Sequence, residues 1–161
     1  MERTRQLQSK INTAVQPALT AYNVFFYANI TPEFKDVVTP NVDTVYCAAF
    51  LELSQKPVVL SVPDTDDRYY EVQMMDAYTN TFASVGRRTT GTKAGQFAIV
   101  GPDWKGVLPS GLKAIKSPTN TAWLVGRVLS KGSHDEEEAR RILRQITLTA
   151  LGHEPAYRKT G

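Results

Sequence analysis

The 161-residue sequence is poor in cysteine and histidine, and this scarcity limits the chemistry that the chain can perform. The single cysteine, Cys47, can form no intramolecular disulfide, and its place inside an apolar run favours a buried thiol over a nucleophile. The two histidines, His134 and His153, have no second His or Cys at zinc-site spacing. We therefore expect no structural zinc and no rigidly held histidine for a serine triad.

Long apolar runs and clusters of charge are missing as well. No run approaches the roughly 20 residues of a transmembrane helix, so we expect no membrane span. Residues 1–10 are charged where a signal peptide would be apolar, so the chain as given carries no export signal and its localisation stays open. The net charge is +3, and the basic residues are scattered rather than clustered with stacking aromatics, which argues against nucleic acid as a partner.

Two short segments look like binding motifs but are explained better as loops. The segment RRTTGTKAG lacks the P-loop order of Gly, Lys and Ser/Thr leading into a helix. Asp64, Asp66 and Asp67 place three carboxylates within four residues, yet a calcium loop needs a further bidentate carboxylate and usually a glycine. A tight turn in which Asp side chains accept hydrogen bonds from nearby amides accounts for them. No metal ion and no cofactor are expected.

What the sequence does contain is a series of short strands. With 42% hydrophobic residues, the chain can bury one core and should form a single globular domain. Alternating apolar runs divided by Pro, Gly and Asp predict a mainly β fold, an antiparallel β-sandwich, whose first three strands form a meander. Both faces of the first strand are apolar, which makes it central. The predicted strands are 45–53, 58–62, 69–75, 81–85, 96–100, 112–116 and 122–129.

Helical patterns appear at both ends of the chain. In the first 28 residues the spacing of Leu7, Ile11 and Val15 predicts one helix, and Pro17 separates it from a second short helix, giving N-terminal helices over 1–28. Near the other end Ser133 and Glu136 match a capping box, which predicts a C-terminal helix as the last element of the domain 29–151. A loose tail, 152–161, would follow. The buried stripe of this helix should be Ala139, Ile142, Leu143 and Ile146.

Polar side chains gather at the ends of the first and third predicted strands. If these strands are neighbours, Asp43 or Asp76 could pair with Arg68 or Arg127, and such an Asp could act as a base or orient a ligand. The alternative is structural, with the same side chains bonding loop backbone and fixing strand ends. The candidate polar pocket consists of Asn41, Asp43, Thr44, Tyr46, Arg68, Tyr70, Gln73, Asp76, Asn80 and Arg127.

Three segments of the sequence resemble the bacterial domain of unknown function 1254. They are PNVDTVYCAAFLELSQKPVVLSVPDTDDRYYEVQMMDAYTNTFAS, RRTTGTKAGQFAIVGPDWKG and SPTNTAWLVGRV, and the similarity covers about residues 21–151. The resemblance implies a β-sandwich of immunoglobulin-like shape, usually followed by a second β domain, the domain of unknown function 1214. That second domain is missing from this sequence, which is either a stand-alone form or a fragment. Many relatives look exported or lipid-anchored.

The resemblance implies no settled activity, but it carries polar positions onto the candidate pocket. The family's Pro-Asn-x-Asp-Thr-x-Tyr pattern falls on residues 40–46, its Arg-Tyr-Tyr on 68–70, its Asp-Ala-aromatic-Thr-Asn on 76–80 and its Gly-Arg on 126–127. Because these positions coincide with the strand-end residues, the resemblance supports a shared pocket without naming its ligand.

Two functional hypotheses follow. The leading one is a non-catalytic binding or assembly module that forms a homo-oligomer, packs on a separate partner domain or holds a small polar ligand. Its basis is the lack of a nucleophile and of a metal motif. The alternative is a hydrolase or lyase in which Asp43 or Asp76 acts as base and Arg68 or Arg127 holds an anionic substrate.

Overall fold

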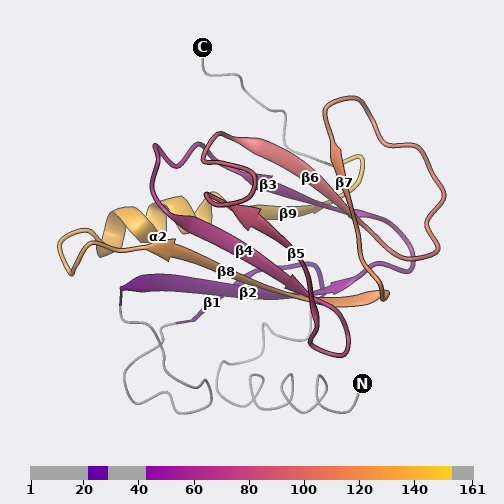
Figure 1. Ribbon diagram of the computed structural model, residues 1–161, viewed down its shortest axis with the longest axis horizontal. Helices are drawn as coiled ribbons and strands as arrows, with labels where there is room; N and C mark the ends of the chain where they lie inside the picture. Colours follow the sequence, from indigo (N-terminus) through magenta and orange to yellow (C-terminus); the bar gives the residue numbers. More distant parts are fainter. Residues whose placement is uncertain (1–21, 29–42, 154–161) are drawn as a thin grey trace.

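In the computed structural model, which describes residues 22–28 and 43–153, nine strands form two sheets packed face to face, together with one helix (Figure 1). The five-stranded sheet has the order β1-β2-β8-β4-β5, and the four-stranded sheet has the order β7-β6-β3-β9. The predicted β-sandwich is therefore confirmed. The strands are β1 Phe26–Ala28, β2 Thr44–Glu52, β3 Val58–Val62, β4 Tyr70–Met75, β5 Thr81–Gly86, β6 Gly95–Val100, β7 Lys113–Lys116, β8 Thr121–Leu129 and β9 Thr147–Ala150.

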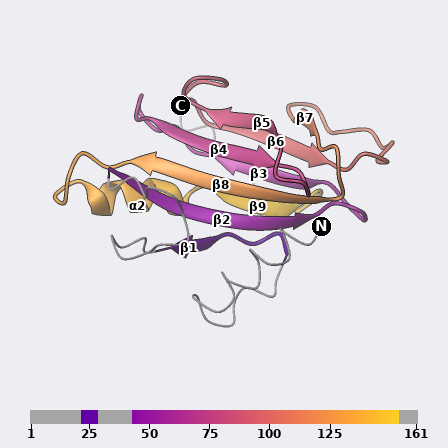
Figure 2. The same cartoon turned by 60° about the horizontal axis from the view of Figure 1, so that its bottom comes forward.

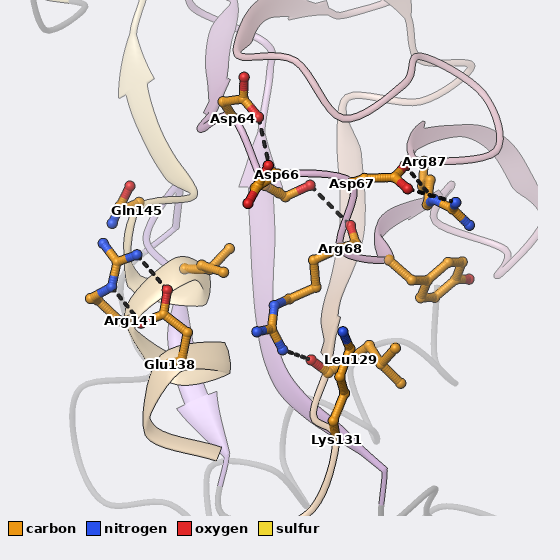
Figure 3. A pocket seen from close by; sticks show the side chains of 13 residues that line it. Asp64, Asp66, Asp67, Arg68, Arg87, Leu129, Lys131, Glu138, Arg141 and Gln145 are labelled. Atoms are coloured by element: carbon orange, nitrogen blue, oxygen red, sulfur yellow. Dashed lines mark hydrogen bonds and ion pairs between the residues drawn. The ribbon is translucent and has the colours of Figure 1, made fainter. Parts of the chain in front are cut away.

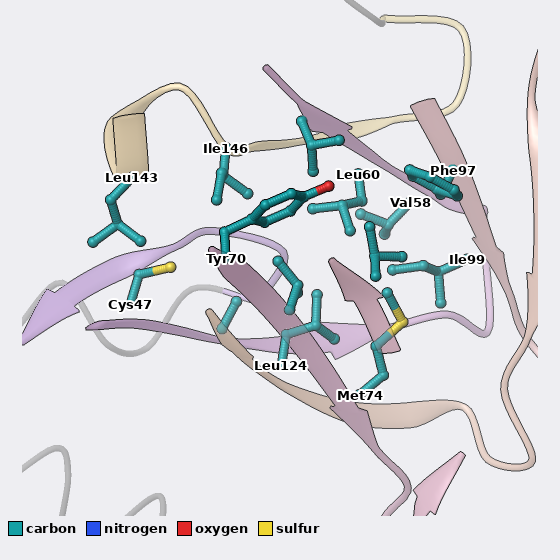
Figure 4. Packing of buried hydrophobic residues seen from close by; sticks show 14 of the residues in the cluster. Cys47, Val58, Leu60, Tyr70, Met74, Phe97, Ile99, Leu124, Leu143 and Ile146 are labelled. Atoms are coloured by element: carbon teal, nitrogen blue, oxygen red, sulfur yellow. The ribbon is translucent and has the colours of Figure 1, made fainter. Parts of the chain in front are cut away.

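The core lies between the two sheets and follows from strand alternation. Along β4, Tyr70, Val72 and Met74 are fully buried, while Glu71 and Gln73 alternate with them and point to the outer face. Figure 4 shows side chains of the two sheets meeting in this layer. Burying one such large apolar side chain contributes about 1.5–3 kcal/mol, so the inward-facing rows hold the layers together. The labelled core residues include Tyr70, Met74, Leu124, Leu60, Phe97 and Ile99.

The order of the strands differs from the predicted meander. β2 and β3 belong to different sheets, and β4 pairs with β8 and β5 rather than with β3 (Figure 2). β8 lies between β2 and β4, and all nine of its residues pair with β2, from Thr44 opposite Leu129 to Glu52 opposite Thr121. Alternation specifies which face of a strand is buried but not which strand lies beside it, and this is why the meander was wrong. β2 has β1 on its other side, so its predicted central position is confirmed.

One pair of strands departs from the antiparallel pattern. β6 and β7 run parallel, with Phe97 opposite Lys113 and Val100 opposite Lys116. A parallel neighbour requires the chain to travel back along the sheet, and the connection 101–112 does so as a long loop that projects from the sandwich in Figure 1.

The helix α2, Glu136–Arg144, packs on the inner face of β2 and β8, beside the short strand β9. Its predicted stripe is confirmed, since Ala139, Ile142 and Leu143 are buried, and Ile146 is buried just beyond the helix end. The predicted capping box is wrong. Asp135 takes the N-cap position and, within the described chain, makes no capping side-chain hydrogen bond.

Two short edge strands were missed by the sequence analysis. The helix is not the last element, because Thr147–Ala150 forms β9 beside β3. The predicted second N-terminal helix is wrong over residues 22–28: Tyr22 and Asn23 form a turn, and β1 follows and pairs with β2. Segments of three or four residues carry too little pattern to be recognised, since they are held by pairing with a neighbour.

Other predictions fall outside the described residues. They are the helix containing Leu7, Ile11 and Val15, the position of Asn41, and residues 154–161 of the tail. The division of the chain at residues 28 and 151 stays a prediction. In the described residues, 22–28 and 43–153, no helix is long and apolar enough to cross a membrane.

Candidate functional site

The charged candidate residues lie toward two opposite ends of the five-stranded sheet. Arg68 precedes β4 and Asp76 follows it, so a six-residue strand of about 20 Å separates them. Asp43 precedes β2 and its carbonyl oxygen accepts a hydrogen bond from the Ser130 amide, 2.8 Å away, at the end of β8. Asp43 and Arg68 thus share one end, which we call the charged end. Asp76 lies at the opposite end of the sheet, which we call the apolar end because large apolar side chains are exposed there.

The Arg68 guanidinium is held by a carboxylate that the sequence analysis did not select. It donates two hydrogen bonds to Asp135, at 2.5 and 2.9 Å, and a third to the Leu129 carbonyl oxygen at 2.9 Å. The side chains of Arg68 and Asp135 are only 13% and 15% exposed. Hydrogen bonds from Arg68, and then from the Lys131 amide, hold the pKa of Asp135 well below its usual value. This pair fixes the turn before β4 to the start of α2.

Arg127 also has an intramolecular partner, on the outer face of the sheet. It donates from Nε to Glu71 at 2.9 Å and from Nη2 to the same oxygen atom. Glu71 accepts further hydrogen bonds from Ser84 at 2.9 Å and Tyr69 at 3.2 Å. Burial alone would raise the pKa of Glu71, but the hydrogen bonds from Arg127 and Ser84 outweigh it and lower the pKa. Tyr46 lies opposite Arg127 in the register of β2 and β8.

Asp76 holds a turn together. Its Oδ1 accepts hydrogen bonds from the backbone amides of Tyr78 at 2.9 Å and Asn80 at 3.0 Å, and its Oδ2 faces the Asn80 side-chain amide at 3.4 Å. The backbone of Thr79 has a positive φ of 68°, and Asp76 is only 7% exposed. These contacts match the structural alternative, in which polar side chains fix strand ends.

The remaining candidates serve the core and the outer face. Tyr70 is fully buried, and its hydroxyl donates to the Gly91 carbonyl oxygen at 3.3 Å. Gln73 donates to Thr81 on the neighbouring β5 at 2.7 Å. The Thr44 hydroxyl is buried and has no hydrogen-bond partner among residues 22–28 and 43–153.

The neighbour relation that joined these residues in the hypothesis does not exist. β8 separates β2 from β4, and the guanidinium partners are Asp135 and Glu71 rather than Asp43 or Asp76. The structure brings Tyr46 and Arg127 together and leaves Asp76 and Asn80 at the far end. Glu71 carried one usable signal, since it alternates with apolar residues along its strand, but only the β4–β8 pairing places it beside Arg127.

A cavity of about 490 Å³ lies at the charged end, between the turn 64–68, the residues after β8, and α2 (Figure 3). Of the predicted candidates, Arg68 contributes to its lining. Glu138 and Arg141 lie on the helix side of the lining, and neither was among the predicted candidates. A smaller hollow of about 110 Å³ lies over Glu71 and Arg127. Segments that are far apart in the sequence form the wall of the larger cavity, so no single sequence motif predicts the cavity.

The three neighbouring aspartates form the predicted turn. Asp64 accepts a hydrogen bond from the Asp66 amide at 2.8 Å and faces Lys93 at 3.0 Å, while Asp67 pairs with Arg87 at 3.0 Å. In the part of the chain that the structure describes, no group of three or more His, Cys, Asp or Glu residues is placed to hold a metal ion.

Cys47 is buried, as its position in an apolar run predicted. The residue is only 1% exposed, and burial raises the pKa of its thiol to about 12 despite a hydrogen bond from the Gly126 backbone. A thiol with this pKa is protonated at neutral pH and is a poor nucleophile. Gly126 lies across from it in β8, and a Cβ there would come within 2.6 Å of the Cys47 sulfur.

These features define a β-sandwich domain whose candidate catalytic residues are engaged in structural contacts. A family model described as a protein of unknown function, DUF1254, matches residues 22–150, and the chain belongs to this family. The resemblance found in the sequence is thereby confirmed.

A solved structure agrees with this fold. The VPA0106 protein from Vibrio parahaemolyticus is 28% identical, with a TM-score of 0.72, and the match covers 96% of this chain and 39% of that one. An uncharacterised protein from Burkholderia cenocepacia is 11% identical, with a TM-score of 0.49, over 68% of this chain and 32% of that one. No curated protein matches the chain significantly. The chain thus spans about two fifths of the VPA0106 chain.

Proposed function

We propose that this domain is a non-catalytic binding module that packs against a protein partner through its apolar end. The observation that carries the proposal is the position of the large apolar side chains that remain exposed. Four of the five such residues in the described ranges belong to segments at this end. They are Tyr22 at 47%, Val24 at 54%, Tyr78 at 63% and Val107 at 92% exposure.

Backbone contacts place these residues at the same end. The Asn23 amide donates to the Phe50 carbonyl oxygen at 2.8 Å, which sets Tyr22 and Val24 beside the end of β2. Tyr78 lies in the turn that follows β4, next to the segment before β8, because the Ala77 amide donates to the Thr119 hydroxyl at 3.0 Å. Val107 belongs to the loop that leaves β6 at this end (Figure 1).

The loop that carries Val107 is held in shape by its own contacts. Gly106 lies against the indole of Trp104, so closely that a Cβ on Gly106 would come within 2.4 Å of the ring. The Trp104 amide in turn donates to the Gly101 carbonyl oxygen at 3.3 Å. A loop that is already held in shape and exposes an apolar residue loses little conformational entropy on binding, which favours a docking role.

The intramolecular pairs argue against the catalytic alternative. The catalytic alternative needs a base beside a guanidinium group that can bind an anionic substrate. Arg68 or Arg127 would therefore have to be free of other partners. Arg68 is engaged by Asp135 and Arg127 by Glu71, and both carboxyl groups have lowered pKa values. The Asp76 carboxylate is engaged by turn amides. No contact in the described residues favours a hydrolase or lyase over a binding module.

A protein partner also fits the comparison with VPA0106. More than half of that chain lies outside the match, so a domain of this fold occurs there beside further polypeptide. When the purified chain is alone in solution, a second copy of it is the protein partner that the apolar end can meet. We therefore expect reversible self-association.

Sedimentation velocity over a range of concentrations tests the proposal. The full chain should shift from monomer toward dimer as concentration rises, and the substitutions Tyr78→Asp and Val107→Asp should each weaken this shift, because they place a charge in the contact. Ser133→Asp is the matched control, since it adds the same charge at an exposed position of the charged end. A chain that stays monomeric at high concentration, or variants that associate like the unchanged protein, would overturn self-association through the apolar end.

A further inference from the structure

The cavity at the charged end is lined by charges of both signs. Its lining contains four cationic and four anionic side chains, so its formal charge is zero. Figure 3 shows Arg141 and Glu138 on the helix side, across the cavity from the turn that carries Asp66 and Arg68. The charged lining residues are Arg68, Arg87, Lys131, Arg141, Asp64, Asp66, Asp67 and Glu138.

Most of these charges neutralise one another within the protein. Arg141 pairs with Glu138 at 2.6 Å and Arg87 with Asp67 at 3.0 Å, while Arg68 and Asp64 have partners just outside the lining. Two charges of opposite sign are left over. The Lys131 ammonium and the Asp66 carboxylate form no ion pair and no side-chain hydrogen bond within the described ranges.

The two leftover charges come from different walls. Asp66 projects from the turn before β4, and its backbone is held with a positive φ of 52°. Lys131 follows β8, beside Leu129. A purely anionic ligand would meet the carboxylates of the lining, and a purely cationic one would meet its guanidinium groups, so either would face like charges. A ligand that carries one positive and one negative charge can pair with Asp66 on one wall and with Lys131 on the other.

We propose that this cavity binds a zwitterion: a free amino acid or short peptide with an aliphatic side chain, whose carboxylate faces Lys131 and whose ammonium group faces Asp66. The volume of about 490 Å³ lies within the range of small-molecule sites. Apolar atoms of Leu129, Ile142 and Tyr69 also line the cavity and provide contacts for an aliphatic side chain. The site is separate from the apolar end and does not depend on the docking role proposed for it.

Isothermal titration calorimetry on the full chain tests this assignment with matched probes. L-leucine and glycyl-L-leucine carry both charges, N-acetyl-L-leucine lacks the cationic group, and L-leucinamide lacks the anionic one. At least one of the two zwitterions should bind, and both blocked compounds should bind roughly tenfold more weakly or worse, because each loses one charge-assisted contact. The proposal is overturned if neither zwitterion binds saturably at millimolar concentrations, or if the blocked compounds bind as tightly as the zwitterions.

Two substitutions connect the binding to the named residues. Asp66→Asn keeps a residue that tolerates positive φ, and Lys131→Gln keeps a long polar side chain; each should weaken zwitterion binding roughly tenfold. Lys56→Gln removes an exposed lysine from the opposite end and should leave binding unchanged. Melting curves of all three variants establish that they are folded. Unaltered affinity in both folded pocket variants would contradict the assignment of the site.

Discussion

The two ends of the sandwich are built from the same strands but stabilised by different interactions. At the charged end, Arg68 joins the turn before β4 to Asp135 at the start of α2, and further ion pairs surround the cavity. At the apolar end, the Asp76 carboxylate closes a turn through backbone amides and leaves Tyr78 exposed. The charged end therefore presents charged side chains in a cavity, and the apolar end presents apolar side chains on turns and a loop. The two proposed binding roles are compatible because neither needs the residues of the other.

The middle of the sheet should give the largest effect, because it supports both ends. Gly126→Ala places a methyl group against the Cys47 sulfur and should reduce the free energy of unfolding by about 1–3 kcal/mol, as measured by urea denaturation. Adding Cys47→Ala removes the clashing sulfur and should restore most of the loss.

The control for this substitution is another glycine in a strand. At Gly95 a Cβ would meet nothing closer than 3.4 Å, so Gly95→Ala should change the unfolding free energy by about 0.5 kcal/mol or less. A double variant no more stable than Gly126→Ala alone would show that the close approach to Cys47 is not the cause.

A smaller effect, confined to the apolar end, is expected from Asp76→Ala. The amides of Tyr78 and Asn80 lose their acceptor, and the free energy of unfolding should fall by about 1 kcal/mol. Because the turn also presents Tyr78, self-association should weaken in parallel. Asp103→Ala, at an exposed position in the loop after β6, is the control. If the Asp76→Ala and Asp103→Ala variants are equally stable, Asp76 does not stabilise the turn.

The smallest effect should come from the charged end and should depend on pH. The pKa of Asp135 is depressed in the folded state, so its contribution to stability is complete above the unfolded-state pKa of about 3.9 and is lost as pH falls through the folded-state pKa. Asp135→Asn should therefore lower the melting temperature by about 1–2 °C at neutral pH, with a difference from the unchanged protein that shrinks below about pH 4.

Glu137→Gln is the matched control for this pH dependence. Glu137 is 83% exposed and only faces Arg144 at 3.5 Å, so its removal should scarcely change the melting temperature at any pH. A difference between Asp135→Asn and the unchanged protein that persists undiminished in acid would mean that the charge on Asp135 does not hold this end together.

Sequence patterns predicted much of the fold and little of the candidate site. Val58–Val62 was predicted with its observed bounds, and the other six predicted strands match within one residue at every end. Burial of Cys47 and of the α2 stripe was also predicted. The polar residues were assigned to one pocket only because β2 and β4 were assumed to be neighbours, and β8 separates them.

The sequence by itself determined which residues of each strand face the core, because the alternation of apolar and polar side chains has the same period as the pleat. It also determined α2, whose apolar stripe repeats with the helical period. Only the tertiary structure decided which strands pair, where β1 and β9 form, and which charges meet. Arg68 and Asp135 are 67 positions apart, and no local pattern connects residues that the packing of turn, strand and helix brings together.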